Sequence, residues 1–234
     1  MKALLILGSV VLVLFLAAPD NLVAQDNVLG CVRSGRDFQA GGIKIVSAKL
    51  RRKGDFKYPQ IAAPRTAQER RFNVDVLKIV RHDLAGGGSY EGYGFSAPYA
   101  TPEFVSVKLW VEFCGASCHV GITAFNFDLK TGKQINKLSE LFKPQSNYLK
   151  TIASYSVGEL RRCQWGEEDD WFKEGTKPTA KNYNIWSLTR DGVKITFPEY
   201  QIAAGAFPGI DVVVPYSHLQ GMVREDIDWL SRLD

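Results

Sequence analysis

The sequence has little of what metal sites, cofactor sites and most hydrolase sites are built from. Its 234 residues include three histidines and four cysteines, and no His pair has the H-x-x-x-H or H-E-x-x-H spacing of a zinc site. There is no G-x-S-x-G elbow, no P-loop and no G-x-G-x-x-G fingerprint after a strand. We therefore expect neither metal nor cofactor, and the sequence favours a protein that is not an enzyme.

A concentrated charge of one sign is also missing. The formal net charge is +4, from 29 Lys and Arg against 25 Asp and Glu. A nucleic-acid-binding surface would need a sharper basic stripe with interleaved aromatic residues, so we expect no nucleic-acid partner. The apolar fraction of 45% is that of an ordinary globular chain, long enough to bury a core.

One long apolar run is present, at the N-terminus. Lys2 precedes the run from Ala3 to Ala18, and the small residue Ala24 follows it. This order is typical of a secretory signal peptide, and the run is short for a bilayer span, which needs about 20 apolar residues. We predict a signal peptide over 1–24, an N-terminal segment over 25–41 and a domain over 42–234, in the periplasm or secreted. The alternative is an uncleaved anchor, the one case in which we expect membrane attachment.

Four cysteines in an exported chain indicate two disulfides, which four cysteines can form in three ways. Cys114 and Cys118 enclose Gly-Ala-Ser and can close a small loop, which leaves Cys31 to pair with Cys163. A redox pair or a metal site is the alternative. The C-x3-C spacing lacks the two-residue gap of thioredoxin-like motifs, and nothing completes a zinc set, so structural disulfides are favoured.

Strand and helix patterns are mixed without a regular βαβ rhythm. The cleanest strand alternates apolar and polar residues from Val105 to Phe113, and Asp191-Gly192 predicts a hairpin in which Gly192 takes a positive φ. Apolar spacing predicts helices over 67–84, after Asn147 and from Leu219 to Leu230. The prediction is a single compact α+β domain with a largely antiparallel sheet, two or three helices and disulfide staples.

His119 is the candidate for chemistry, because it lies beside the predicted disulfide loop and between two strands. The alternative to a binding role for this protein is therefore an envelope hydrolase with His119 as general base and Ser117 or Asp128 nearby. A structural role for His119 is favoured, and Asp128 can simply accept N–H groups of the following turn.

The candidate binding residues are aromatic and acidic. Trp110, Tyr93 and Tyr99 are expected to be exposed, although Trp110 can also just cover the second face of the sheet. An acidic run can dock a basic partner or be a solvated helix face or loop; it consists of Glu167, Glu168, Asp169 and Asp170.

The order of several motifs resembles the RsiV-like family of exported bacterial domains. The motifs are YPQI before a helix with Asn73, FNFDLKTGK over 125–133, and FPEYQIAAGAFPG followed by VVVPYSHL. Such domains occur in the ectodomain of a lysozyme-sensing anti-sigma factor and beside a peptidoglycan deacetylase domain. The resemblance implies an exported, non-enzymatic α+β module with affinity for peptidoglycan or a lysozyme-type muramidase. Where the family has Gly-Gly-Ala-His, this chain carries Cys118 directly before His119, so a cysteine-closed loop replaces the usual one.

Overall fold

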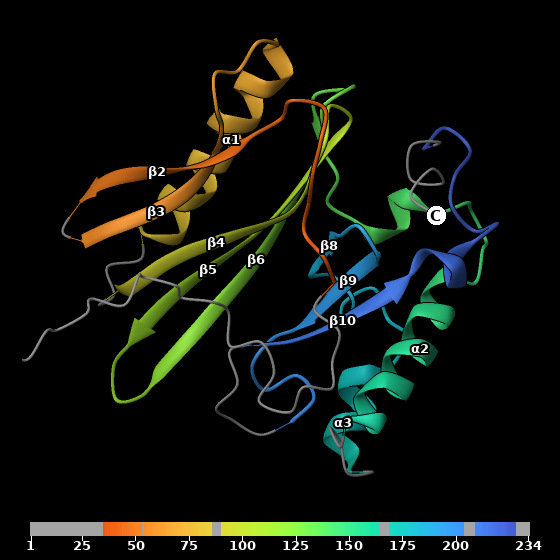
Figure 1. Ribbon diagram of the computed structural model, residues 1–234. Coiled ribbons are helices and arrows are strands. Elements are labelled where there is room, and N and C mark those ends of the chain that lie inside the picture. Colours follow the sequence, from red (N-terminus) through yellow and green to blue (C-terminus); the bar gives the residue numbers. More distant parts are fainter. Residues whose placement is uncertain (1–34, 53, 86–89, 164–168, 204–208, 228–234) are drawn as a thin grey trace, which may run out of the picture.

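A long antiparallel hairpin, β5 (Phe104–Cys114) and β6 (Cys118–Asp128), runs through the middle of the computed structural model (Figure 1). The structure describes residues 35–52, 54–85, 90–163, 169–203 and 209–227. The hairpin belongs to a five-stranded sheet in the order β1-β4-β5-β6-β7, in which all neighbours are antiparallel except β1 and β4. The other strands of this sheet are β1 (Phe38–Gln39), β4 (Tyr90–Ala100) and β7 (Lys133–Gln134).

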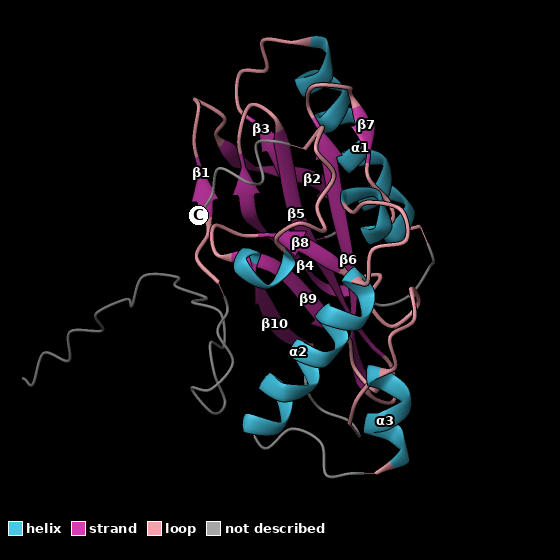
Figure 2. Cartoon of the chain, turned by 90° about the vertical axis from the view of Figure 1, so that its right-hand side faces the viewer, coloured by secondary structure: helices cyan, strands magenta, loops and turns pink. Residues whose placement is uncertain are grey.

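Both faces of this sheet are covered. On one face, α1 (Ala67–Asp83) and the two-stranded ribbon of β2 (Ile45–Arg52) and β3 (Gly54–Ile61) form one apolar core with the sheet (Figure 1). The other core lies against a second antiparallel sheet of β8 (Trp186–Leu188), β9 (Gly192–Phe197) and β10 (Ile210–Pro215). Helix α2 (Tyr148–Arg162) packs on β10 from outside, and α3 (Asp170–Thr176) lies next to it (Figure 2). Short 3-10 turns are η1 (Leu138–Leu141) and η2 (Tyr216–Leu219).

The predicted α+β fold in a single domain is confirmed. The capping box at Thr66 and Glu69 starts α1 as predicted, and α2 follows Asn147. The third helix is placed differently from the prediction: it is α3, whereas after Leu219 the described chain forms turns and one bridge of Val223 to Phe142. That bridge pairs the chain with a backbone far away in the sequence, which apolar spacing alone does not reveal.

The Asp191-Gly192 turn forms, but for another reason than predicted. Gly192 is not among the residues with positive φ. A Cβ there would lie 2.0 Å from the carbonyl oxygen of Val214, so Gly192 is required by the close approach of β10. Asp191 accepts hydrogen bonds from the backbone N–H and the guanidinium of Arg36, and so holds the N-terminal end of the described chain.

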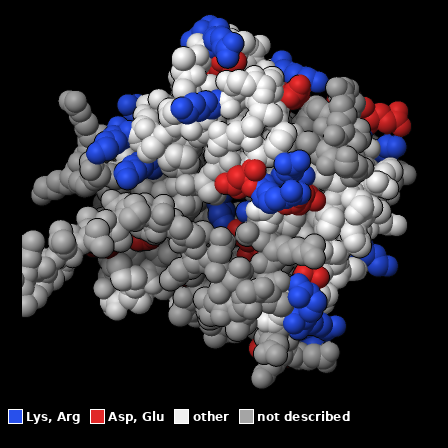
Figure 3. All heavy atoms as spheres, in the orientation of Figure 1, with Lys and Arg blue, Asp and Glu red and all other residues white. Residues whose placement is uncertain are grey.

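The predicted signal peptide and Cys31 lie outside the described residues, so the domain boundaries stay predictions. In the part of the chain that the structure describes, no helix is long and apolar enough to cross a membrane. Both basic and acidic side chains are visible on the face that Figure 3 shows, with several Lys and Arg side chains together on its upper left.

A buried polar bridge joins the two large sheets. The Asn126 amide donates to the carbonyl oxygen of Trp186 (2.9 Å) and accepts from the Ser106 hydroxyl (2.5 Å), which in turn accepts from the N–H of Leu188 (3.0 Å). Asn126 and Ser106 are both buried. The sequence pattern assigned Ser106 to a polar face of β5, and this face is in fact covered by the second sheet.

Asn126→Ala should lower the free energy of unfolding by about 2–4 kcal/mol, because it leaves the Trp186 carbonyl without its amide donor and the Ser106 O–H without its acceptor, both in a buried place. Urea denaturation measures the loss. The matched control Asn136→Ala changes an exposed amide of the same size and should stay within about 0.5 kcal/mol of the parent. An equal effect of both variants would contradict the role given to the bridge.

A buried charge cluster lies beside this bridge. The Asp211 carboxylate is 2.7 Å from Lys108 Nζ and 3.8 Å from Lys194 Nζ, and it accepts the Thr196 hydroxyl at 2.6 Å. Burial by itself raises the pKa of the Asp211 carboxyl, but the two lysine charges and the hydrogen bonds outweigh it, and the pKa is lowered overall. Lys108 lies on β5 and Asp211 on β10, so the cluster connects the same two sheets.

The lowered pKa of Asp211 gives stability that is present above the carboxyl's unfolded-state pKa and is lost as the pH falls through its lower folded-state value. Asp211→Asn should therefore flatten the acid limb of the stability profile. It should also cost about 3–5 kcal/mol near neutral pH, because two lysines lose their buried counter-charge. Thermal melts across the acid range test this, and parallel acid limbs for the two proteins would refute it.

Candidate functional site

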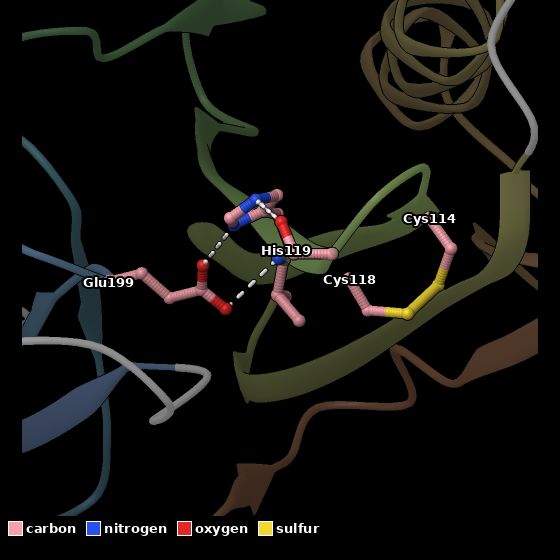
Figure 4. Close-up of a disulfide and its surroundings, with 6 residues drawn as sticks. Cys114, Cys118, His119 and Glu199 are labelled. Carbon is pink, nitrogen blue, oxygen red and sulfur yellow. Dashed lines mark hydrogen bonds and ion pairs between the residues drawn. A yellow bond between two sulfur atoms is a disulfide. The ribbon is translucent and has the colours of Figure 1, made fainter.

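The site lies at the tip of the β5–β6 hairpin, where it meets the chain that leaves β9 (Figure 4). Three residues, Gly115 to Ser117, connect the strands, and the Gly115 N–H donates to the Ser117 carbonyl at 3.0 Å. Cys114 and Cys118 face each other across the pair and are at disulfide distance, with 2.09 Å between the sulfurs, as predicted. The disulfide thus fixes the residues on both sides of Ser117.

His119 is hydrogen-bonded on both ring nitrogens (Figure 4). Its Nε2 is 2.7 Å from the Ser117 hydroxyl, and its Nδ1 is 3.3 Å from Oε2 of Glu199. Because an ionised carboxylate only accepts, a neutral imidazole in this place carries its proton on Nδ1, and its Nε2 then accepts the Ser117 O–H. Serine, histidine and a carboxylate therefore form a chain in which each nitrogen has the partner that it has in a Ser-His-Asp triad.

Glu199 is held in place by the backbone. Pro198 follows the last residue of β9, and Oε1 of Glu199 accepts the N–H of Val120 at 3.1 Å. The Glu199 side chain is 14% exposed and that of His119 34%, so the carboxylate is sheltered and the imidazole partly open. The sequence hypothesis named Ser117 or Asp128 as partners of His119; Ser117 is one, and the carboxylate is Glu199 instead.

Asp128 lies at the opposite end of β6 and stabilises the following turn, as in the alternative interpretation. Its carboxylate accepts the backbone N–H groups of Lys130 and Thr131, at 2.7 and 3.0 Å, in the turn after the strand. Eighty residues separate His119 from Glu199, and no local pattern joins them.

Exposed aromatic rings continue from His119 on both sides. The ring of Phe113 is 5.7 Å from that of His119, Tyr200 is 6.0 Å away on the other side, and Trp171 lies 6.5 Å beyond Tyr200. Phe113 is 40%, Trp171 44% and Tyr200 49% exposed, and they are three of the four large hydrophobic residues exposed in the described chain. We call Phe113, His119, Tyr200 and Trp171 the aromatic row.

Helix α3 fixes the far end of the row. Trp171 donates its indole N–H to the carbonyl of Tyr200 at 2.5 Å, and Tyr200 has a φ of 61°, which is unusual for a residue other than glycine. A Cβ on Gly175 would lie 1.8 Å from the carbonyl oxygen of Gln201, so helix and loop are in direct backbone contact. The side chain of Gln201 also donates to the Gly175 carbonyl, at 2.8 Å. This docking holds Tyr200 in its conformation.

The predicted binding residues lie mostly elsewhere. Trp110 is half-buried and faces Gly94 on β4, where a Cβ would lie 2.5 Å from its ring, so it covers the sheet as in the alternative interpretation. A contact role for Trp110 stays a prediction. Tyr93 and Tyr99 are buried, which contradicts their expected exposure, because β4 is covered on both faces.

The acidic run is described in part. Asp169 caps α3 by accepting the N–H of Phe172 at 2.7 Å, and Asp170 is exposed on the first turn. Glu167 and Glu168 lie outside the described residues, so docking through this run is still a prediction. The residue directly after the acidic run, Trp171, belongs to the aromatic row. An aromatic residue beside a helix cap is the sequence feature that could have indicated it.

Cys163 ends α2 and is buried. Its predicted partner Cys31 lies outside the described residues, so this second disulfide stays a prediction. Within the described ranges, no group of three or more His, Cys, Asp or Glu residues is arranged to hold a metal ion.

A match to a known protein family covers one part of this site. Residues 139–217 match the family described as "Protein of unknown function (DUF3298)". The matched region holds Glu199, Tyr200 and Trp171, and the β5–β6 tip with Ser117 and His119 lies outside it. The site is thus formed where the DUF3298 region meets the preceding hairpin.

The chain is also similar to a curated protein, the peptidoglycan-N-acetylmuramic acid deacetylase PdaC of Bacillus subtilis, with 26% identity over 102 residues. The similarity covers 43% of this chain and 22% of that protein, so the chain spans less than a quarter of its length.

Two crystal structures share the fold. A DUF3298 family protein of Pseudomonas aeruginosa has a TM-score of 0.60 at 15% identity, over 79% of this chain and 94% of the other. A DUF3298 family member of Bacteroides fragilis has a TM-score of 0.55 at 13% identity, over 84% and 99%. The α+β architecture is therefore shared well beyond residues 139–217.

Long-range 1H–15N NMR of the imidazole should find neutral His119 with its proton on Nδ1, because Glu199 accepts there and Ser117 donates to Nε2. In Glu199→Ala the proton should move largely to Nε2. The control Glu225→Ala removes an exposed carboxylate that pairs with Lys143 and should leave the His119 spectrum unchanged. A His119 spectrum that does not respond to Glu199→Ala would contradict the geometry.

Proposed function

We propose that the chain is an exported module that binds the polysaccharide strands of the bacterial cell wall through the aromatic row. The observation that carries this proposal is the row itself. Large apolar side chains that are exposed together in a soluble domain mark an interaction surface. Here three such side chains and one imidazole follow one another at ring distances of 5.7, 6.0 and 6.5 Å.

A saccharide suits this surface better than a charged polymer. Sugar rings present apolar C–H faces that stack on aromatic rings, while their hydroxyl groups bond to polar groups at the edge. The row offers both kinds of contact, because Ser117 and Glu199 lie beside His119. Phe113 belongs to β5 and Trp171 to α3, so the row runs from the hairpin to this helix and suits an extended ligand.

The charges of the molecule agree with a ligand bound by stacking. The formal net charge is only +4, and both basic and acidic side chains are visible on the described part of the face in Figure 3, so we expect no strong field of one sign that would attract a polyanion. The described Asp169 is engaged in capping α3, which leaves the acidic run with less to offer a basic muramidase.

The sequence and the relatives support the cell wall as the source of the polysaccharide. The predicted signal peptide directs the chain to the periplasm or the exterior. The relative PdaC is named a peptidoglycan-N-acetylmuramic acid deacetylase, and the similar part is 22% of its length. The RsiV-like resemblance of the sequence is part of this proposal and implies the same surroundings.

Tyr200→Ala and Trp171→Ala should each weaken binding to purified peptidoglycan sacculi about 3–10-fold, because each removes one stacking ring. Co-sedimentation of the protein with sacculi over a concentration series gives the affinity. Val74→Ala is the matched control, since Val74 is an exposed apolar residue on α1 that is not part of the row.

Unchanged sedimentation of both variants would refute the aromatic row as the binding surface. A lysozyme-type muramidase, tested in parallel by its retention on the immobilised protein, distinguishes the two partners that the sequence suggested. Retention of the muramidase without binding to sacculi would replace the polysaccharide with a protein partner.

A further inference from the structure

We propose that Ser117, His119 and Glu199 form a hydrolytic relay that cleaves short O-acyl esters, with Ser117 as the nucleophile. The relay itself does not depend on the proposed function. That the ester is carried by a wall polysaccharide rests on it, because the aromatic row would lay such a ligand across His119.

The first argument is that the two ring nitrogens of His119 have different partners. A general base that activates serine needs a free lone pair toward the hydroxyl and a carboxylate on the other nitrogen. In this protein Nε2 lies 2.7 Å from the Ser117 hydroxyl and Nδ1 lies 3.3 Å from Glu199. Glu199 is in turn oriented by the N–H of Val120, at 3.1 Å.

The second argument is that docking of the two sheets does not explain the Ser117 contact. The bonds from Glu199 to His119 and to Val120 connect the hairpin with the loop after β9, but Ser117 and His119 lie on the same hairpin. A hydrogen bond between two exposed side chains two residues apart contributes little to stability. The bond places the Ser117 hydroxyl against the imidazole base of His119. The Cys114–Cys118 disulfide fixes the loop that carries Ser117.

The chemistry balances without a cofactor. The Ser117 proton passes to Nε2 as Oγ attacks the acyl carbon, and Glu199 stabilises the imidazolium that forms. Collapse of the tetrahedral intermediate breaks the ester C–O bond, and the departing alcohol takes the proton from Nε2. Water, deprotonated by His119, then attacks the acyl-serine, which releases the carboxylic acid and restores the Ser117 hydroxyl.

Stabilisation of the oxyanion can come from the loop. In the part of the chain that the structure describes, the backbone N–H groups of Ala116 and Ser117 donate to no other group. The N–H of the nucleophilic serine is one of the two donors in a serine-protease oxyanion hole. The hairpin tip from Gly115 to Ser117 is exposed, so it suits a short acyl group carried on a long, exposed chain.

The test combines covalent labelling with turnover. A fluorophosphonate probe should label the protein at Ser117, as located by peptide mass spectrometry, and p-nitrophenyl acetate should be hydrolysed faster than in buffer. Ser117→Ala and His119→Ala should abolish both signals, and Glu199→Gln should lower the hydrolysis rate about 100-fold or more. Ser139→Ala, which changes another exposed serine, is the control and should keep both.

Ester cleavage and polysaccharide binding should respond to different substitutions. Ser117→Ala should lose labelling and hydrolysis but keep most of its affinity for sacculi, because all four rings of the aromatic row remain, whereas Tyr200→Ala should lose affinity for sacculi. Absence of label from Ser117, or equal hydrolysis by Ser117→Ala and the parent, would overturn the relay and leave the binding proposal intact. Loss of sacculus binding by Tyr200→Ala, together with labelling of the parent protein at Ser117, would support both.

Discussion

The contact between the two large sheets is the constraint on which the rest of the structure depends. Ser106 and Asn126 reach across it from β5 and β6 to the backbone of β8, and Asp211 holds two lysines between β5, β9 and β10. Apolar surfaces can slide over one another, but buried polar groups must meet specific partners. These contacts therefore define one position of the second sheet on the first.

The candidate site forms because the second sheet has this one position on the first. His119 and Ser117 come with the hairpin, and Glu199 and Tyr200 come with the chain after β9. A small rotation of one sheet on the other would separate the imidazole from its carboxylate. The boundary of the DUF3298 match, which begins at residue 139, runs between these two halves of the site. A property of the site thus need not be a property of every chain with a DUF3298 region.

Binding and hydrolysis would use one surface in two ways. The aromatic rings give contact area at low conformational cost, and His119 is at once a member of the row and of the polar chain to Ser117. The disulfide at Cys114 and Cys118 serves both, because it keeps the hairpin tip in one shape.

The sequence by itself determined the elements whose causes are local. These are the α+β class, the capping box of α1, the strand from Val105 to Phe113 and the pairing of Cys114 with Cys118, since each depends on residues close together in the chain. Only the tertiary structure decided that Ser106 is buried, that Gly192 makes room for β10, and that residues 220–227 form turns and one bridge. It also decided that Glu199, rather than Asp128, is the partner of His119. The physical reason is the same throughout: how one sheet packs on another is set by contacts between residues far apart in the sequence, and periodicity and spacing report only on neighbours.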